Sequence, residues 1–275
     1  MSAAGRLKGR VLIVAGSDSG GGAGIQADIK TVTALGAYAM TAITALTAQD
    51  TNGVAGVVGV EPGFIQQQMR LVLDDIGADA LKTGMLHNTP VIEAVAAVLR
   101  ERASDIPLVV DPVMYAKGGH PLLEPAAVAA LKATLLPLAA IVTPNIPEAE
   151  AIAGAPIRTV EDMRMAARAI AGFGPRAVLL KGGHREDGDV TDILFDGDAI
   201  EAMTHPRIAT RNTHGTGCTL ASALAAGLAQ GMSMRAAVRR ARAYVLEAIR
   251  TAPGLGHGHG PLNHAHTVAP FDGRD

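Results

Sequence analysis

A short turn just before an apolar segment holds the residues with the clearest chemical potential. Residues 212–218 read Asn-Thr-His-Gly-Thr-Gly-Cys and lead directly into an Ala-rich stretch that ends near Gln230. Glycines let the backbone turn sharply, and a helix that begins there contributes amide N–H groups and the positive end of its dipole. We therefore predict that Gly215, Thr216 and Gly217 form an anion hole.

Cys218 completes this turn and is the only cysteine in the sequence. On the first turn of a helix, the positive field favours a thiolate over a thiol and so lowers the thiol pKa. The sulfur would then be able to act as a base. A lone cysteine can equally be a small buried apolar residue, and the turn alone leaves both interpretations open.

Other polar residues stand where buried strands are expected to end. Asp111, Asn145, Glu148 and Lys181 each lie at or just beyond the carboxyl end of such a strand, where ligands bind in open α/β sheets. Two carboxylates with an amide suit hydrated Mg²⁺, and a lysine beside two glycines can reach nucleotide phosphates. Asn145 and Glu148 also suit the start of a helix, and the two interpretations are compatible. Together with an anion hole and one base, this set predicts phosphoryl transfer.

A glycine-rich run from Gly20 to Gly24 follows an expected strand and precedes an expected helix. Residues 22–27 fit a loose G-x-G-x-x-A dinucleotide pattern, but the glycines are crowded and begin several residues beyond the strand. The sequence G-x-x-x-x-G-K-[ST] of a Walker loop does not occur in the chain. The run is better interpreted as backbone that lies against a small substrate, with Asp28 on the following helix offering a carboxylate.

The hydrophobic pattern predicts the scaffold that positions these residues. Short apolar runs alternate with longer segments of helical period, which is typical of βα units around a mainly parallel sheet. Buried strands are expected at Val11 to Ala15, Ala80 to Lys82, Leu108 to Val110, Ala140 to Thr143 and Ala177 to Leu180. Helices are expected at Ile25 to Leu35, Pro62 to Ile76, Pro90 to Arg100, Pro125 to Leu135, Val160 to Ala171, Thr216 to Gln230 and Arg235 to Arg250. An antiparallel hairpin is expected from Asp192 to Phe195 and Glu201 to Ile208.

The composition is that of a folded, water-exposed protein with no strong excess of charge. The 275 residues include 48% hydrophobic and 18% charged side chains with a formal net charge of −2, and the basic residues are spread along the chain. This favours a folded protein that binds small molecules and argues against nucleic-acid or membrane partners. With one cysteine, no secretory signal and no membrane-length apolar run, we expect a cytoplasmic protein without an internal disulfide. We expect a single domain over residues 1–275, with loose ends at 1–9 and 262–275.

Nearly the whole chain, from Val11 to Pro261, is similar to one known family. The segments that carry the resemblance are Val14 to Asp28, Ala45 to Gln49, Lys82 to Leu86, Thr143 to Asn145, Lys181 to His184, Asn212 to Cys218 and Gly256 to Pro261. They resemble the bacterial hydroxymethylpyrimidine/phosphomethylpyrimidine kinase of thiamine biosynthesis. The resemblance implies a three-layer α/β/α ribokinase-like fold, a homodimer, and two successive phosphorylations of 4-amino-5-hydroxymethyl-2-methylpyrimidine with MgATP.

The resemblance also implies roles for individual residues. Cys218 matches the base, at the position where related kinases usually carry aspartate, and the glycine turn before it matches the anion hole. The residues that match the ATP side are Lys181, Asn145 and Thr213, and those that match the Mg²⁺ site, through water, are Asp111 and Glu148. The residues that match the pyrimidine site are Gly16, Asp28, Gln49, Met85 and Val113, with Gln49 bonded to the aminopyrimidine edge.

Three other functions remain open on the sequence. A pyridoxal kinase of the same superfamily is the nearest, and Gln49 argues against it because members that look specific for pyridoxal tend to lack glutamine there. A dinucleotide-binding oxidoreductase built on the Gly22 region would bind NAD. A silent nucleotide-binding regulator would not turn over ATP, and the complete set of Cys218, Lys181 and Glu148 argues against it. The C-terminal run with His257, His259, His264 and His266 alternates with glycine and offers no rigid metal geometry.

Overall fold

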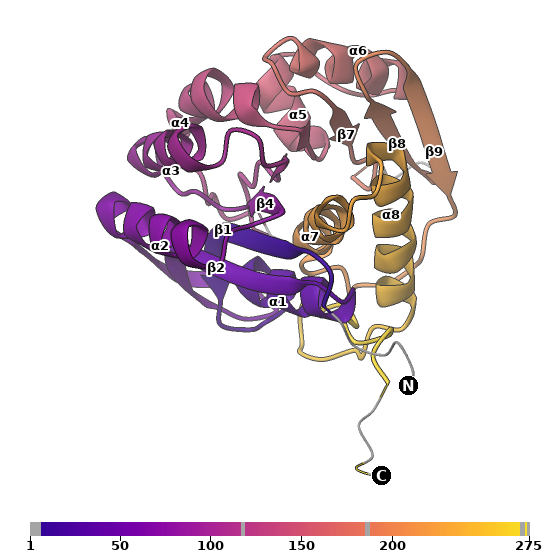
Figure 1. Cartoon of the computed structure of the whole chain (residues 1–275). Helices are drawn as coiled ribbons and strands as arrows, with labels where there is room; N and C mark the ends of the chain where they lie inside the picture. Colours follow the sequence, from indigo (N-terminus) through magenta and orange to yellow (C-terminus); the bar gives the residue numbers. More distant parts are fainter. Residues whose placement is uncertain (1–6, 117–118, 185–187, 270–272, 274–275) are drawn as a thin grey trace.

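A computed structural model describes residues 7–116, 119–184, 188–269 and 273 of the chain. In this described part, nine strands form one sheet in the order β3-β2-β1-β4-β5-β6-β7-β8-β9, with helices on both faces (Figure 1). The strands from β2 to β7 in this order are parallel, whereas β3 pairs antiparallel at one end and β8 and β9 pair antiparallel at the other. The predicted three-layer α/β/α fold with a mainly parallel sheet is confirmed.

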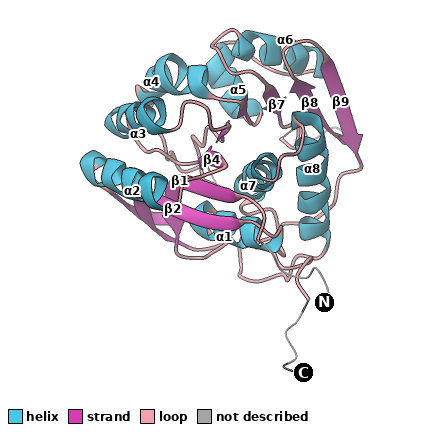
Figure 2. Cartoon of the chain, in the orientation of Figure 1, coloured by secondary structure: helices cyan, strands magenta, loops and turns pink. Residues whose placement is uncertain are grey.

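The strands are short in the middle of the sheet and long toward β2. Their bounds are β1 Arg10–Asp18, β2 Tyr38–Gln49, β3 Val54–Gly59, β4 Ala80–Thr83, β5 Leu108–Val110, β6 Ile141–Val142, β7 Val178–Leu180, β8 Val190–Phe195 and β9 Ile200–His205. The helices are α1 Gly24–Ala34, α2 Pro62–Asp75, α3 Thr89–Arg102, α4 Ala127–Ala130, α5 Ile146–Ala153, α6 Val160–Ala171, α7 Thr216–Ala229 and α8 Met234–Arg250. Figure 2 shows how they alternate with the strands.

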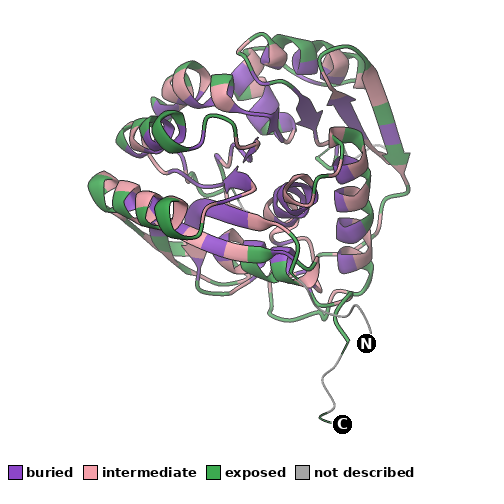
Figure 3. Ribbon diagram, viewed as in Figure 1, coloured by how far each residue is buried: buried purple, intermediate pink, exposed green. Residues whose placement is uncertain are grey.

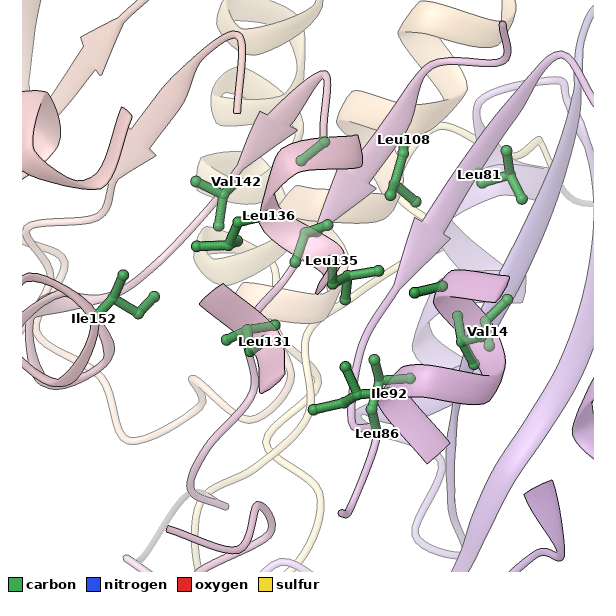
Figure 4. Close-up of a cluster of buried hydrophobic side chains, with 14 of the residues drawn as sticks. Val14, Leu81, Leu86, Ile92, Leu108, Leu131, Leu135, Leu136, Val142 and Ile152 are labelled. Atoms are coloured by element: carbon green, nitrogen blue, oxygen red, sulfur yellow. The ribbon is translucent and has the colours of Figure 1, made fainter. Parts of the chain in front are cut away.

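Each face of the sheet has its own hydrophobic core, because alternate strand residues point to opposite faces. Leu12 and Val14 of β1 pack with α2, α3, α5 and α6, in the cluster of leucine, isoleucine and valine side chains that Figure 4 shows in part. Val11 and Ile13 pack on the other face with α1, α7 and α8. The carboxyl ends of the parallel strands are left free of this packing, and they carry the polar residues discussed below.

Helix α7 lies close to its neighbours and is buried along most of its length (Figure 3). Its small residues allow this approach: a Cβ on Gly227 would lie 2.9 Å from the Cβ of Ala237 in α8. The Ala-rich composition that follows the turn at residues 212–218 is therefore explained by close packing of α7 against α1, α8 and the sheet. This packing fixes the direction in which the N-terminus of α7 points.

The structure differs from the expected elements in two places. The hairpin of β2 and β3 was not predicted, because its alanine, threonine and glycine residues give no strong apolar alternation. The helix expected at Pro125 to Leu135 is a short α4 followed by a π-helical turn, Leu131–Leu135, and a 3₁₀ turn, Leu136–Leu138. None of the helices in the described ranges has the length and hydropathy that a membrane span requires.

The ends of the chain are better anchored than expected. The Lys8 amide donates to Gly36, while residues 1–6 of the predicted loose N-terminus lie outside the described residues. At the other end, Leu262 and His264 are buried, and the Thr267 hydroxyl donates to the Ala34 carbonyl at 2.9 Å. Residues 262–267, which belong to the segment expected to be loose, are therefore held to the body by buried side chains and hydrogen bonds.

Candidate active site

The N-terminus of α7 points at the carboxyl ends of the parallel strands. Gly215 caps the helix in the left-handed conformation with a φ of 79°, and a Cβ there would collide with the carbonyl oxygen of Gly22. Only glycine is compatible with both the conformation and this contact. The Thr216 hydroxyl donates to the Thr213 carbonyl at 2.8 Å and closes the turn. Free amides at a helix start attract anions, as predicted for this segment.

Gly217 brings the turn next to charged side chains from two strands. A Cβ on Gly217 would lie 3.1 Å from Nζ of Lys181 and 3.5 Å from Oδ2 of Asp111. Lys181 follows β7 and Asp111 follows β5, so residues far apart in the sequence meet at one point. The structure thus brings the predicted anion hole, the predicted phosphate-binding lysine and a predicted metal ligand together.

Asp111 is buried, and only one of its two carboxylate oxygens has hydrogen-bond partners. Its Oδ1 accepts a hydrogen bond from Lys181 Nζ at 3.0 Å and another from the Thr143 hydroxyl at 3.2 Å. Its Oδ2 is buried without a hydrogen-bond partner in the described structure. Burial opposes the charge of Lys181, but the carboxylates of Asp111 and Glu148 outweigh it and raise the lysine pKa. A buried carboxylate oxygen without a partner is costly, and this atom faces the site.

Glu148 is a second buried carboxyl group near Asp111. It forms a capping box with Asn145: the Glu148 amide donates to Asn145 Oδ1 at 3.0 Å, and the Asn145 amide donates to Glu148 Oε2 at 2.8 Å. Burial raises the pKa of Glu148 to about 7, the charge of Lys181 opposes this rise, and Asp111 adds to it. Asn145 and Glu148 therefore cap α5 and also stand beside the site, as the sequence allowed.

These carboxylates fit a magnesium ion that keeps most of its own water. The unpartnered Oδ2 of Asp111 and the raised pKa of Glu148 both indicate a place where a cation is favourable. In the described residues no three His, Cys, Asp or Glu side chains are grouped to hold a metal. Mg²⁺ commonly needs only one or two carboxylates, with waters and substrate phosphates as its other ligands.

Cys218 is half-buried on the first turn of α7, and the Gly24 amide N–H approaches its sulfur. Burial raises the pKa of the thiol to about 12, whereas the charge of Lys82 and the Gly24 amide act in the opposite direction. The predicted lowering of the thiol pKa is therefore wrong for the protein without ligands. The reason is that loss of water around the sulfur outweighs the helix field and the nearby cation.

Four of the five residues predicted to contact the pyrimidine lie at or near strand ends: Gly16 in β1, Gln49 at the end of β2, Met85 after β4 and Val113 after β5. Gly16 and Met85 are buried neighbours, because a Cβ on Gly16 would lie 2.9 Å from the Met85 sulfur. Val113 lines a small pocket with Asp111 and Gly84. Gly16 and Met85 thus place bare backbone beside a thioether, which suits contact with a flat aromatic ring.

Gln49 reaches the same region from the end of β2. Its Oε1 accepts from the Thr47 hydroxyl at 3.2 Å, and its Nε2 lies 3.4 Å from Nε2 of His214. The amide is half-buried and thus still accessible. The long strand β2, which the sequence analysis missed, is what carries Gln49 to the turn that precedes α7.

Asp28 lies beneath the site rather than on its surface. The side chain is fully buried, and Lys82 Nζ donates to its Oδ2 at 2.8 Å while the Ser222 hydroxyl donates to its Oδ1 at 2.6 Å. Both carboxylate oxygens are thus occupied by protein groups. The structure gives Asp28 no open face toward a ligand, because α1 presses it against β4 and α7.

Two further pairs of residues shape the site and were missed from the sequence. The first is Asp18, which accepts from the amides of Gly20, Gly22 and Ala23, with His214 2.9 Å away. The second is Lys82 with Asp28. An aspartate at a strand end before glycines, and a lysine inside an otherwise buried strand, were the signals available.

The chain is similar to known proteins in both sequence and structure. The family model described as Phosphomethylpyrimidine kinase matches residues 18–263. The Thiamine biosynthesis bifunctional protein ThiED of Geobacter sulfurreducens is 56% identical over 268 residues, covering 98% of this chain and 54% of that protein, so the chain spans about half of its length. The Hydroxymethylpyrimidine/phosphomethylpyrimidine kinase of Bacillus subtilis is 48% identical over 256 residues, covering 93% of this chain and 94% of that one.

The chain is also similar to solved structures of vitamin kinases. An ADP complex of Bacillus subtilis pyridoxal kinase is 37% identical with a TM-score of 0.86, covering 94% of this chain and 98% of that one. The phosphomethylpyrimidine kinase of Clostridium difficile is 43% identical with a TM-score of 0.78, covering 88% of this chain and all of that one, at 100%. The pyridoxal kinase of Staphylococcus aureus in complex with AMP-PCP is 36% identical with a TM-score of 0.86, covering 95% of this chain and 94% of that one.

Proposed function

The chain belongs to the phosphomethylpyrimidine kinase family, and on that premise we propose that it phosphorylates 4-amino-5-hydroxymethyl-2-methylpyrimidine and then the resulting monophosphate, with MgATP as donor. The activity is that of a hydroxymethylpyrimidine/phosphomethylpyrimidine kinase in thiamine biosynthesis. The observation that supports this most directly is the meeting of Gly217, Lys181 and Asp111 beside Cys218. A transferring phosphoryl group requires this combination of amides, a cation and a nearby base.

On the nucleotide side, Lys181, Asn145 and Thr213 are the residues we assign to ATP. Solved relatives with ADP and AMP-PCP support a nucleotide site in this fold. Asp111 and Glu148 would hold Mg²⁺ through water. The ion would neutralise phosphate charge, and the unpartnered Asp111 oxygen is the atom that best fits this role.

Cys218 is the base we assign to the first phosphorylation. In its thiolate form, the sulfur takes the proton of the pyrimidine hydroxymethyl group and becomes a neutral thiol, while the alcohol oxygen forms a bond to the γ-phosphorus of ATP. The bond between the γ-phosphorus and the bridging oxygen breaks, and ADP leaves with that electron pair. The amides of Gly215, Thr216 and Gly217 stabilise the negative charge on the transferring group.

In the second phosphorylation the acceptor is a phosphate oxygen. A phosphate monoester loses its second proton near pH 6, so this acceptor is already ionised at neutral pH. This acceptor needs no base. Catalysis of the second reaction then depends mainly on the anion hole and Lys181, which stabilise the charge of the phosphates. The two reactions therefore place different demands on Cys218.

Gln49, Met85, Val113 and Gly16 form the pyrimidine site in this proposal. Gln49 hydrogen-bonds the aminopyrimidine edge, and the other residues provide a close backbone and apolar walls. Pyridoxal kinase activity is the second candidate, favoured by TM-scores of 0.86 with two pyridoxal kinases. The amide of Gln49, which can both donate and accept, favours the aminopyrimidine.

Association into a homodimer and a cytoplasmic location complete the proposal. Val58 of β3 and Leu46 of β2 are paired across the strands at the edge of the sheet, with 66% and 50% of their surfaces exposed. Exposed apolar residues on an edge hairpin favour contact with a second copy. The mass of the protein in solution, measured by light scattering, tests this association.

Product analysis is the experiment that tests the function. The protein is incubated with MgATP and either the aminopyrimidine alcohol or pyridoxal, and the phosphorylated products are separated and identified. We expect the pyrimidine monophosphate first and the diphosphate later. Phosphorylation of pyridoxal alone would contradict the proposal and favour the second candidate.

A further inference from the structure

A buried ion pair lies beneath the site. Lys82 of β4 and Asp28 of α1 are both 0% exposed, and their charged groups are 2.8 Å apart. Transfer of two charges out of water costs so much that apolar residues often replace a buried ion pair without loss of stability. Stability alone therefore does not explain a lysine inside this strand, which indicates that its charge has a functional role.

The pair lies against the face of α7 that carries Cys218. Ser222 donates to Asp28 Oδ1, and Ser222 stands four residues after Cys218 on the same helix. Residues four apart share one face of a helix, one turn from each other. The sulfur and the ion pair are thus neighbours, and Asp28 is held by a second hydrogen bond that fixes its orientation.

The ammonium of Lys82 lies next to Gly84, close to the residues of the candidate site. An ammonium has three N–H groups, and among the described residues Asp28 is its only hydrogen-bond partner. A Cβ on Gly84 would lie 2.9 Å from Nζ, so the absence of a side chain at position 84 makes room for the charge. Gly84 lines the pocket that also contains Asp111 and Val113.

We propose that Lys82, held in place by Asp28, is a positioning residue whose buried positive charge stabilises the thiolate form of Cys218, which is the form that can accept the substrate proton. The inference rests on the role proposed for Cys218 as base. A fixed charge in a site of low polarity acts more strongly than in water and needs no reorganisation during the reaction. The aspartate prevents the ammonium from moving toward solvent or losing its proton.

The charges around the sulfur support this assignment. Burial raises the pKa of the Cys218 thiol, and the charge of Lys82 is the strongest influence that lowers it. Asp28 from α1 and Asp111 after β5 act against the thiolate, while Lys181 after β7 adds a second cation. Lys82 itself is kept protonated, because Asp28, Cys218 and Asp111 outweigh the effect of burial and raise its pKa.

The chain offers a sharp test because Cys218 is its only cysteine. The rate at which iodoacetamide alkylates the protein therefore reports on this thiol alone. In Lys82→Met we expect that rate at neutral pH to fall about tenfold or more, which corresponds to a rise of one unit in the thiol pKa. Raising the pH should restore it. Arg10→Met is the control, because Arg10 pairs with Asp79, which directly precedes β4, and the substitution so removes an ion pair at the end of this strand away from Cys218.

Kinetics of the two phosphorylations give an independent measurement. Lys82→Met should lower kcat for the alcohol and leave kcat for the monophosphate nearly unchanged, since only the alcohol has to lose a proton. If Lys82→Met does not fold, the double variant Lys82→Met/Asp28→Leu replaces the whole pair by apolar residues. We expect it to lose alkylation rate and kcat for the alcohol in the same direction but to a smaller extent, because the charge of Asp28, which opposes the thiolate, is removed as well.

An unchanged alkylation rate in a folded variant would overturn the inference, and so would an equal loss of both phosphorylations. The base role of Cys218 is judged separately. If Cys218→Ala still phosphorylates the alcohol at a normal rate, the proposed function of the cysteine fails. If Cys218→Ala is inactive and Lys82→Met keeps normal thiol reactivity, only the inference about Lys82 fails.

Discussion

Nε2 of His214 lies 2.9 Å from Oδ2 of Asp18 and so joins the glycine-rich loop after β1 to the turn that begins α7. The contact between the two segments is close: a Cβ on Gly22 would lie 2.5 Å from Cδ2 of His214. The His214 amide also donates to the carbonyl of Gly260 at 3.1 Å, which ties the C-terminal glycine run to the same turn. One histidine thus positions the proposed anion hole relative to the loop on which we expect the substrate to lie.

Replacing His214 tests this connection. His214→Ala removes a hydrogen bond to an ionised carboxylate, and such bonds contribute about 1.5–3 kcal/mol to stability. We expect a loss of that size in urea unfolding, together with a lower kcat because the anion hole is less well held. His205→Ala, on the edge strand β9, is the control and should change neither. A variant with normal stability and normal kcat would show that the connection is not needed.

The two phosphorylations should respond differently to the loss of Cys218. Cys218→Ala should cut the rate with the alcohol about a hundredfold or more, the usual scale for loss of a general base. The rate with the monophosphate should fall much less, because a phosphate oxygen is ionised without help at neutral pH. Initial rates with each acceptor, at saturating ATP, are the measurement. Equal losses would place the cysteine outside proton transfer.

Gln49 should decide between pyrimidine and pyridoxal. Gln49→Met keeps the length of the side chain but removes its donor and acceptor, which leaves the polar edge of the aminopyrimidine without a partner. We expect kcat/KM for the pyrimidine to fall by an amount that corresponds to about 1–3 kcal/mol, with little change for pyridoxal. The ratio of the two kcat/KM values is the readout, and an unchanged ratio would contradict the assignment.

Local patterns allowed part of this site to be predicted. The turn at Gly215 to Cys218 and the cap formed by Asn145 and Glu148 were found because all their requirements lie within a few residues of sequence. The strand ends that carry Asp111 and Lys181 were found for a related reason, since apolar runs that end in polar residues mark the binding edge of an open sheet.

Properties that depend on tertiary packing could not be predicted. Asp28 was expected to face the substrate, but it pairs with Lys82, 54 residues away in sequence, and this partner is chosen by the packing of α1 on β4. The thiol pKa of Cys218 depends on how many atoms surround the sulfur, which the helix position does not reveal. Strand β2 was missed because its alanines and threonines, only some of which are buried, give no strong alternation of apolar and polar residues.

The anchored C-terminal segment should make stability depend on pH. His264 is 6% exposed, and its Nε2 lies 3.0 Å from the Thr219 hydroxyl on α7. Burial, aided by the charges of Lys30 and His266, lowers its pKa to about 4, whereas an unfolded histidine titrates near pH 6.5. The unfolded chain therefore binds more protons than the folded one between these two values, and stability must fall as the pH falls through that window.

His264→Gln should flatten this dependence, because glutamine keeps a polar group near Thr219 but cannot be protonated. The wild-type protein should lose about 2–3 kcal/mol between pH 6.5 and 4 in urea unfolding, and the variant should lose less. Burial raises the pKa of Asp18, but its hydrogen bonds to His214 and Ala23 outweigh that effect and lower it overall, so this carboxylate loses its contribution only at more acidic pH. Because the histidine acts in the upper window and Asp18 in the lower, a variant that follows the wild-type curve above pH 4 would show that another group is responsible.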